Sequence, residues 1–177
     1  MASEKTIYQN KAFVLREVED DSGRRAYLDH PGSVGIVPLL ERDGVTYVVL
    51  VRQTRFALGQ RLLEIPAGTR EPGEDPATTA RRELPEEVGY ACGRLDPLGE
   101  VYLAPGYSNE SMRLYVARDL RPERAQADAD EVDLEAELVP LADAVATARA
   151  GGYHDAKTAL GILLVSDAAS SRPAQSL

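Results

Sequence analysis

The sequence predicts a mixed α/β fold, and three stretches carry that prediction. Two near-continuous apolar runs, at residues 34–40 and 45–51, flank a short turn and are expected to be strands buried on both faces. Between residues 75 and 89, Asp75 followed by Pro76 is typical of a helix start, and Gly89 suits the helix end. The chain of 177 residues is long enough for one domain with a full core. The remaining elements are expected as strands at residues 62–65, 98–103, 112–117 and 134–139 and helices at residues 141–150 and 156–165.

The N-terminal stretch has a different character from the rest of the chain. Residues 12–18 and 24–28 are expected to pair as a hairpin across a turn, and they hold few apolar side chains. Because an isolated hairpin is marginally stable, this segment is expected to need a partner surface. We therefore divide the chain into an N-terminal strand segment at residues 1–32, a main domain at residues 33–165 and a disordered tail at residues 166–177.

Composition excludes several classes of protein. The net charge of −9 argues against a general nucleic-acid or anionic-membrane surface. Cys92 is the single cysteine, so an internal disulfide and a cysteine-based zinc site are excluded. No apolar stretch is long enough to span a bilayer, and the first residues lack the apolar run of a secretory signal, so a cytoplasmic location is expected.

One segment, residues 68–90, fits the pattern G-x5-E-x7-R-E-U-x-E-E-x-G-U, in which U is apolar. The fixed positions are Gly68, Glu74, Arg82, Glu83, Leu84, Glu86, Glu87, Gly89 and Tyr90. A helix here places Glu83, Glu86 and Glu87 on one face, where like charges repel. Carboxylate oxygens are the ligands that Mg²⁺ or Mn²⁺ prefers, and such a cation would remove the repulsion. A solvated acidic face is the ordinary interpretation of a charge run, but the arginine and both glycines in register favour a metal site.

Pro85 opposes this helix, because it lies between the glutamates. A proline in a helix interior removes one hydrogen bond and presses on the carbonyl of Arg81, at a cost of roughly 3 kcal/mol. We expect it to break or kink the helix between Arg81 and Pro85, with the surrounding fold holding Glu83 near the other two glutamates.

The pattern is the Nudix box, the signature of hydrolases that split a diphosphate linked to a nucleoside, and the flanking residues resemble the ADP-ribose pyrophosphatase branch of that superfamily. LLEIPAG precedes the box, and Pro105 lies sixteen residues beyond Gly89 and opens the loop PGYSNE. The order of N-terminal hairpin, acidic loop, VPLADAV and AKTALGILL is similar as well. The resemblance implies an α/β/α sandwich with a mixed sheet and an N-terminal antiparallel strand segment. It also implies a homodimer in which that segment reaches the partner.

The resemblance also assigns roles to residues. Glu83, Glu86, Glu87 and the Ala67 carbonyl would hold Mg²⁺ or Mn²⁺, while Arg82 would orient the glutamates and Glu74 would hold the loop after Gly68. A glutamate of the acidic loop at residues 121–133 would act as general base. The candidates are Glu131 first, then Asp130, Asp128 and Glu135.

By the same resemblance, substrate contacts are expected from the residues after the strand at 45–51 and from the loop after Pro105. The candidates are Arg55, Glu110, Pro105, Gly106 and, more weakly, Arg52. From the residues alone, the two arginines could equally pair with acids. Tyr8 and Phe13 could stack on adenine, although core packing is the commoner role of such aromatics.

The implied reaction is hydrolysis of ADP-ribose to AMP and ribose 5-phosphate. Two alternatives stay open at this point: a Nudix hydrolase of another nucleotide sugar, such as GDP-mannose or a UDP-sugar, and a non-catalytic Nudix-fold ligand sensor.

Overall fold

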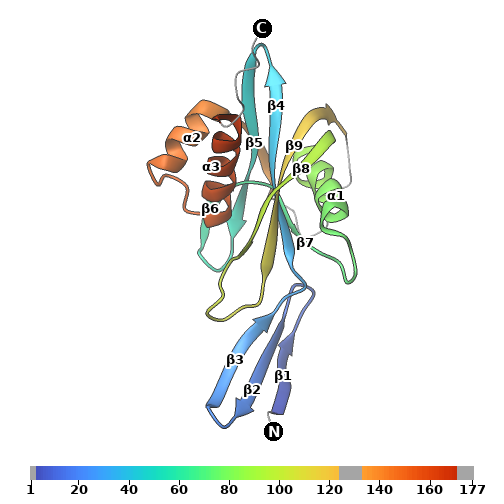
Figure 1. Cartoon of the computed structure of the whole chain (residues 1–177), viewed down its shortest axis with the longest axis vertical. Coiled ribbons are helices and arrows are strands. Elements are labelled where there is room, and N and C mark those ends of the chain that lie inside the picture. Colours follow the sequence, from blue (N-terminus) through green and yellow to red (C-terminus); the bar gives the residue numbers. More distant parts are fainter. Residues whose placement is uncertain (1–2, 124–132, 171–177) are drawn as a thin grey trace.

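The computed structural model describes residues 3–123 and 133–170, which form a mixed sheet between two helical layers and a smaller sheet at one end (Figure 1). The strands are β1 (Ser3–Gln9), β2 (Val14–Asp20), β3 (Gly23–Asp29), β4 (Ser33–Arg42), β5 (Val45–Arg55), β6 (Gln60–Glu64), β7 (Ala67–Thr69), β8 (Tyr90–Tyr102), β9 (Ser111–Pro122) and β10 (Glu135–Pro140). The helices are α1 (Pro76–Val88), α2 (Leu141–Arg149) and α3 (Ala156–Ser170).

The central sheet has seven strands in the order β10-β5-β4-β9-β8, with β6 paired to β5 and β7 paired to β4. β4 and β9 run parallel and the other pairs run antiparallel, so the sheet is mixed. Helix α1 covers one face, and α2 and α3 cover the other (Figure 1). The expected α/β/α sandwich is therefore confirmed.

Burial of both sheet faces explains the continuous apolar runs. Side chains alternate along a strand, so Val48 and Leu50 of β5 pack under α2 and α3, whereas Val49 and Val51 pack under α1. All four are fully buried. A strand segment with a helical layer on each side needs apolar residues at every position, and residues 48–51 are all apolar.

Several boundaries differ from those that the sequence predicts. β8 begins at Tyr90, immediately after α1, and β9 continues to Pro122 into the stretch expected to be a loop. α3 continues to Ser170, so the expectation of a disordered tail starting at residue 166 is wrong for residues 166–170. None of the helices that the structure describes has the length and apolarity to cross a membrane.

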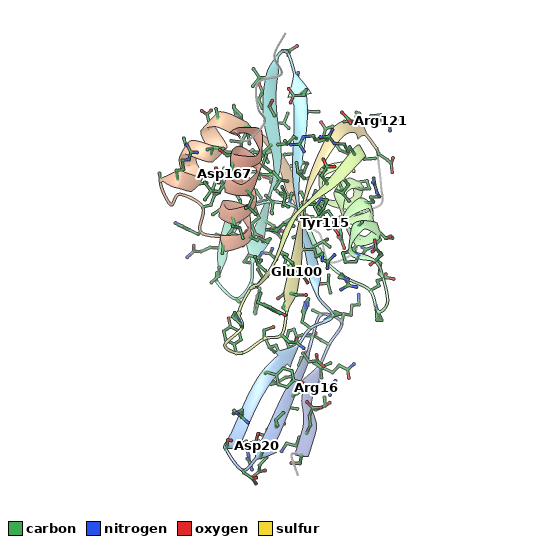
Figure 2. All side chains as sticks on the ribbon, viewed as in Figure 1. Arg16, Asp20, Glu100, Tyr115, Arg121 and Asp167 are labelled. Carbon is green, nitrogen blue, oxygen red and sulfur yellow. The ribbon has the colours of Figure 1, made fainter. Side chains whose placement is uncertain are left out.

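The N-terminal segment forms a separate antiparallel sheet, β1-β2-β3, that extends away from the sandwich (Figure 1). The sequence predicts short strands in this segment and pairs two of them as the β2–β3 hairpin, and the structure adds β1 as a third, fully exposed strand. The sheet joins the body through backbone bonds from Leu28 N to Tyr107 O (2.8 Å) and from Asn109 N to Leu28 O (3.2 Å). Figure 2 shows Arg16 in this sheet near the junction and Asp20 toward its far tip.

Candidate active site

Helix α1 has a defined beginning and end, as the sequence predicts. The Asp75 carboxylate accepts hydrogen bonds from the backbone N–H groups of Ala77 (3.0 Å) and Thr78 (3.3 Å), which caps the first turn. Gly89 ends the helix with a φ of 74°, and its N–H donates to the Pro85 carbonyl at 3.1 Å. The helix is continuous through Pro85, so the expected break is absent and the glutamates before and after the proline stay on one helix.

The short strand β7 lies directly against the glutamates of α1. The Ala67 N–H donates to Glu87 Oε2 at 3.1 Å. A Cβ atom on Gly68 would lie 2.0 Å from Glu83 Oε1, so only a glycine leaves room for that carboxylate. The Glu83 side chain is 8% exposed and that of Glu86 is 20% exposed. The fixed glycine of the motif therefore has a steric cause.

Arg82 joins the acidic side chains. Its Nη1 atom lies 2.7 Å from Glu83 Oε1 and 3.2 Å from Glu86 Oε2, and its Nη2 atom lies 3.3 Å from Glu74 Oε2. Burial opposes the charged guanidinium, but the hydrogen bond to Glu74 and the charges of three glutamates outweigh it and raise the pKa of Arg82. Arg82 therefore stays positively charged at every working pH and contacts Glu74, Glu83 and Glu86.

Glu74 is held between Arg82 and the turn that precedes the helix. The Arg82 hydrogen bond is the main reason that the pKa of Glu74 is below its ordinary value, and the backbone N–H of Glu71 also donates to its Oε2 at 3.1 Å. Arg70 donates to the Glu74 carbonyl oxygen at 2.7 Å. These contacts agree with the structural role expected for Glu74, which is to hold the loop after Gly68.

The donor set on α1 fits a hard divalent cation. Glu83, Glu86 and Glu87 offer only carboxylate oxygens, and the Ala67 and Gly68 backbone lies beside two of them. Within residues 3–123 and 133–170, however, no three acidic, histidine or cysteine side chains converge as a ready-made metal group. Arg82 supplies the compensating positive charge in this conformation.

Two cavities meet at β7. One, of about 520 Å³, is lined by Glu83, Glu87 and Arg82 together with Ala67 and Gly68. The other has a volume of about 270 Å³ and is also lined by Ala67 and Gly68. Its remaining lining includes the predicted substrate residues Arg55 and Glu110, together with Ser33 and Lys157. Arg55 and Glu110 thus lie in a cavity that adjoins the glutamate cavity at Ala67 and Gly68.

Arg55 is held by an acid that the sequence analysis did not single out. Glu64, at the end of β6, is fully buried, and its two oxygens accept from Arg55 Nε (2.7 Å) and Nη2 (2.5 Å). Burial favours the neutral acid, yet the hydrogen bonds and charges of Arg55 and Lys157 keep the pKa of Glu64 below its ordinary value. The signal in the sequence was a lone acid in the apolar run LLEI.

Arg52 lies elsewhere. Arg52 follows Val51 on β5, so its side chain lies on the opposite face, under α2 and α3, where its pairing partner Leu63 also packs. There its Nη2 atom lies 2.8 Å from Glu137 Oε2. It lines a separate cavity of about 380 Å³ together with Arg61 and Tyr153. The structure therefore does not bring Arg52 to the glutamates.

The remaining predicted residues are distributed as follows. Pro105 and Gly106 belong to the loop between β8 and β9, where Gly106 is exposed. Glu110 Oε1 accepts from Ser33 Oγ at 2.7 Å. Of the base candidates, Glu135 begins β10 and lies 3.4 Å from Arg61 Nη1. Asp128, Asp130 and Glu131 lie outside the described residues.

The aromatic candidates Tyr8 and Phe13 contact each other, with ring centroids 6.1 Å apart. Tyr8 is 54% exposed, so it is not a core residue within this chain. Phe13 lines a cavity of about 270 Å³ with Pro31 and Pro72, next to the glutamate cavity, which Pro31 and Pro72 also line.

Comparison with known proteins places this geometry in a family. Residues 29–159 match the NUDIX domain, which leaves β1 and β2 and nearly all of β3 outside the match. The chain is 33% identical over 171 residues to an ADP-ribose pyrophosphatase of Bacillus subtilis, with 90% of each chain covered. It is 34% identical over 170 residues to an ADP-ribose pyrophosphatase of Mycobacterium tuberculosis, with 92% of this chain and 81% of the relative covered.

Among solved structures, an ADP compounds hydrolase superposes with a TM-score of 0.76 at 27% identity, covering 97% of this chain and 95% of its own. That superposition includes the N-terminal sheet as well as the sandwich, because nearly the whole chain is covered. The box of residues 68–90, the sandwich and these matches agree, and the chain belongs to the Nudix family.

Proposed function

We propose that this chain hydrolyses the diphosphate of ADP-ribose, releasing AMP and ribose 5-phosphate, with Mg²⁺ or Mn²⁺ as cofactor. The observation that carries the proposal is the set of three glutamates and Arg82 on α1, of which Glu87 and Glu83 lie against Ala67 and Gly68, with Arg55 and Glu110 in the adjoining cavity. Relatives with the printed name ADP-ribose pyrophosphatase that span most of both chains support this substrate.

Glu83, Glu86, Glu87 and the Ala67 carbonyl would hold the cation. When bound, it supplies charge neutralisation at the diphosphate oxygens and lowers the pKa of a bound water. In the reaction, the oxygen of a water molecule forms a bond to one phosphorus and the bridging P–O bond breaks. The proton of that water passes to the general base, for which Glu131 is our first candidate and Asp130 the second.

The side chains of the second cavity bind and orient the substrate in this proposal. Arg55 offers a guanidinium to phosphate oxygens, a pairing that arginine makes well because its donors form a planar fork. Glu110, hydrogen-bonded to Ser33, accepts from substrate hydroxyl groups, and Pro105 and Gly106 shape the loop that carries it. Arg82 keeps the glutamates in place and does not contact the substrate.

We also propose that the protein works as a homodimer in which the N-terminal sheet contacts the partner. The exposed apolar side chains Ile7 (49%) and Tyr8 (54%) on β1 support this assembly, since exposed apolar residues on a projecting sheet favour a protein interface. A cytoplasmic location and the lack of a nucleic-acid or membrane partner stay predictions from composition.

The test is a substrate panel. Purified protein with Mg²⁺ is given ADP-ribose, GDP-mannose and a UDP-sugar at equal concentration, and the products are separated and identified. We expect the highest kcat/KM for ADP-ribose, with AMP and ribose 5-phosphate as products. A higher kcat/KM for GDP-mannose or the UDP-sugar would reassign the substrate, and binding without turnover of any of the three would favour a ligand sensor.

A further inference from the structure

Lys157, in the first turn of α3, is a buried lysine outside the glutamate set. It is 7% exposed, and its ammonium group contacts Glu64 Oε2 and also lies 3.0 Å from Asp155 Oδ2. Removing a lysine and a glutamate from water is costly, and apolar residues of similar volume often give equal or greater stability. Stability alone therefore does not account for an ion pair at this place.

The ion pair continues from Glu64 to Arg55. Glu64 binds the Nε–Nη2 edge of Arg55 with both carboxylate oxygens, and one of these oxygens also contacts Lys157. The Nη1 end of the guanidinium takes no part in this pair. A bidentate contact fixes the plane of a guanidinium as well as its position.

This chain of charges ends at the site. Arg55 and Lys157 both line the 270 Å³ cavity that shares Ala67 and Gly68 with the glutamate cavity. The hydrogen bond to Glu64 is the main cause that raises the pKa of Arg55, and the charges of Asp155 and Glu87 add to it, so Arg55 lies within electrostatic range of both α3 and α1. Val51, Gln53 and Arg55 are every second residue of β5, so their side chains lie on the same face of the sheet, the one that α1 covers.

The neighbour of Lys157 fixes the same stretch of backbone. Thr158 Oγ1 accepts from the Ile65 N–H at 2.8 Å and donates to Asp155 Oδ2 at 2.5 Å. Asp155 caps α3 through the Thr158 N–H at 3.0 Å. The start of α3 therefore holds both the Glu64 side chain and the Ile65 backbone, two residues before Ala67.

We propose that Lys157 is a positioning residue: by holding the Glu64 carboxylate, it fixes the Arg55 guanidinium with its Nη1 end directed to the substrate. This inference rests on the proposed function, in which Arg55 binds the diphosphate substrate. Without the ammonium group, Glu64 is held by Arg55 alone, and the guanidinium loses the fixed partner that sets its orientation.

The test compares Lys157→Met, Lys157→Arg and Arg55→Met, with Arg94→Met as the matched control. Arg94 forms an exposed ion pair with Asp96 at 2.8 Å on β8, so its loss removes an ion pair of ordinary surface exposure away from the site. We expect Lys157→Met to raise the KM for ADP-ribose about 10- to 100-fold, as misplacement of a binding group does, with a smaller change in kcat. Lys157→Arg should recover most of the loss, and Arg94→Met should behave as wild type.

Two further measurements separate positioning from general support. If Lys157 acts through Arg55, the double variant Lys157→Met/Arg55→Met has the same KM as Arg55→Met alone. Hydrogen exchange of the Arg55 Nε–H, assigned by its loss in the NMR spectrum of Arg55→Met, should be slow in wild type and fast in Lys157→Met. Additive losses in the double variant, or an unchanged Nε–H signal, would overturn the inference.

The NMR measurement needs no substrate, so its outcome is independent of the proposed function. A wild-type protein that leaves ADP-ribose intact refutes the substrate assignment, while the Arg55 signal still decides the role of Lys157. Unfolding in denaturant identifies any variant that fails to fold. Should Lys157→Met be such a variant, Lys157→Gln, which keeps a hydrogen-bond donor without the charge, takes its place with the same expected loss of Nε–H protection.

Discussion

A Cβ atom on Gly68 would lie 1.9 Å from the Cδ of Glu83. The backbone of β7 thus forms the wall against which the Glu83 carboxylate lies, and the neighbouring residue Ala67 donates its N–H to Glu87. Strand β7 and helix α1 therefore pack so closely that the Glu83 carboxylate occupies the space where a Cβ atom on residue 68 would lie.

Gly68→Ala should therefore displace Glu83 and lower turnover by about 100-fold or more, in line with the loss of a preorganised charged group. The φ of Gly68 is not in the left-handed region, so the clash and not backbone strain is the cause. Gly99→Ala is the matched control, because a Cβ there meets no atom within 4 Å. Equal kcat values in the two variants would show that the Glu83 position is not critical.

Glu83→Gln and Glu87→Gln should each reduce turnover by about 100-fold or more. From sequence, relief of repulsion favours unchanged or improved folding in these variants. The structure changes that expectation for Glu83, because its carboxylate is buried against Arg82 at 2.7 Å. Loss of this charged contact should lower the free energy of unfolding by about 1–3 kcal/mol in Glu83→Gln. Denaturant unfolding and steady-state kinetics on the same samples measure both effects, and wild-type-like turnover would refute the metal-ligand assignment.

Pro85→Ala should raise stability and leave the site nearly unchanged. The helix is already continuous, so alanine restores a bond to the Arg81 carbonyl and removes a helix cost of roughly 3 kcal/mol. Pro85 is buried, and loss of its ring methylenes costs about 0.8 kcal/mol each, which leaves a net gain of about 1–2 kcal/mol. Mg²⁺ titration of activity should shift less than about threefold, since the restored bond lies within one turn.

Pro97→Ala, in strand β8, is the control for this change because no helix bond can form there. A rise in turnover of about tenfold or more in Pro85→Ala would mean that the proline holds the glutamates away from their best geometry, contrary to our account.

Deletion of residues 1–28 should give monomers in sedimentation measurements and weaken substrate binding. The segment exposes Ile7 and Tyr8 and contacts the body mainly at residues 107–109. Ile7→Asp should have the same effect on assembly without removing the sheet, because a charge opposes burial of that face. Val45→Asp, at an exposed apolar position at the start of β5 in the sandwich, is its control. A shortened protein that stays a fully active dimer would contradict the assignment.

The junction between the N-terminal sheet and the body should weaken in acid. Hydrogen bonds from Asn109 and Arg16 lower the pKa of Asp29 from its ordinary value of 3.8. A depressed carboxyl pKa contributes stability that is present above pH 3.8 and is lost as the pH falls through the lower native value. Hydrogen exchange of the Leu28 N–H, which donates to Tyr107, should therefore quicken below pH 3.8 relative to Val49 in the core. Asp29→Asn should abolish this dependence, and the same dependence in that variant would exclude Asp29 as its cause.

Some of these relationships follow from local sequence and others from contacts between distant residues. The helix cap at Asp75 and the end at Gly89 depend on neighbouring residues, so the sequence predicts both. The burial of β4 and β5 follows from their apolar runs. The different faces of Arg52 and Arg55 follow from the alternation of a strand, which places residues three apart on opposite sides.

Glu64 could not be assigned in this way. Its partner Lys157 lies 93 positions away, and no local pattern connects an acid in one strand with a lysine at the start of the last helix. The motif marks Gly68 as a fixed position, but the reason for it, the close contact with the Glu83 carboxylate, depends on the packing of β7 on α1. The pairing of β1 with β2 was not predicted because an exposed strand of mainly polar residues lacks the alternation that fixes strand boundaries in a sequence.

The hydrogen bond between Thr158 and Ile65 has a consequence for how shortened forms of this chain behave. A product that stops before residue 157 would retain every fixed position of the segment 68–90 and the whole β4–β9 framework. It would nevertheless leave the Ile65 N–H and the buried Glu64 carboxylate without the groups on α3 that satisfy them. An intact box is therefore not enough to predict a working enzyme in a C-terminally shortened form of this chain, because the first turn of the last helix must be present as well.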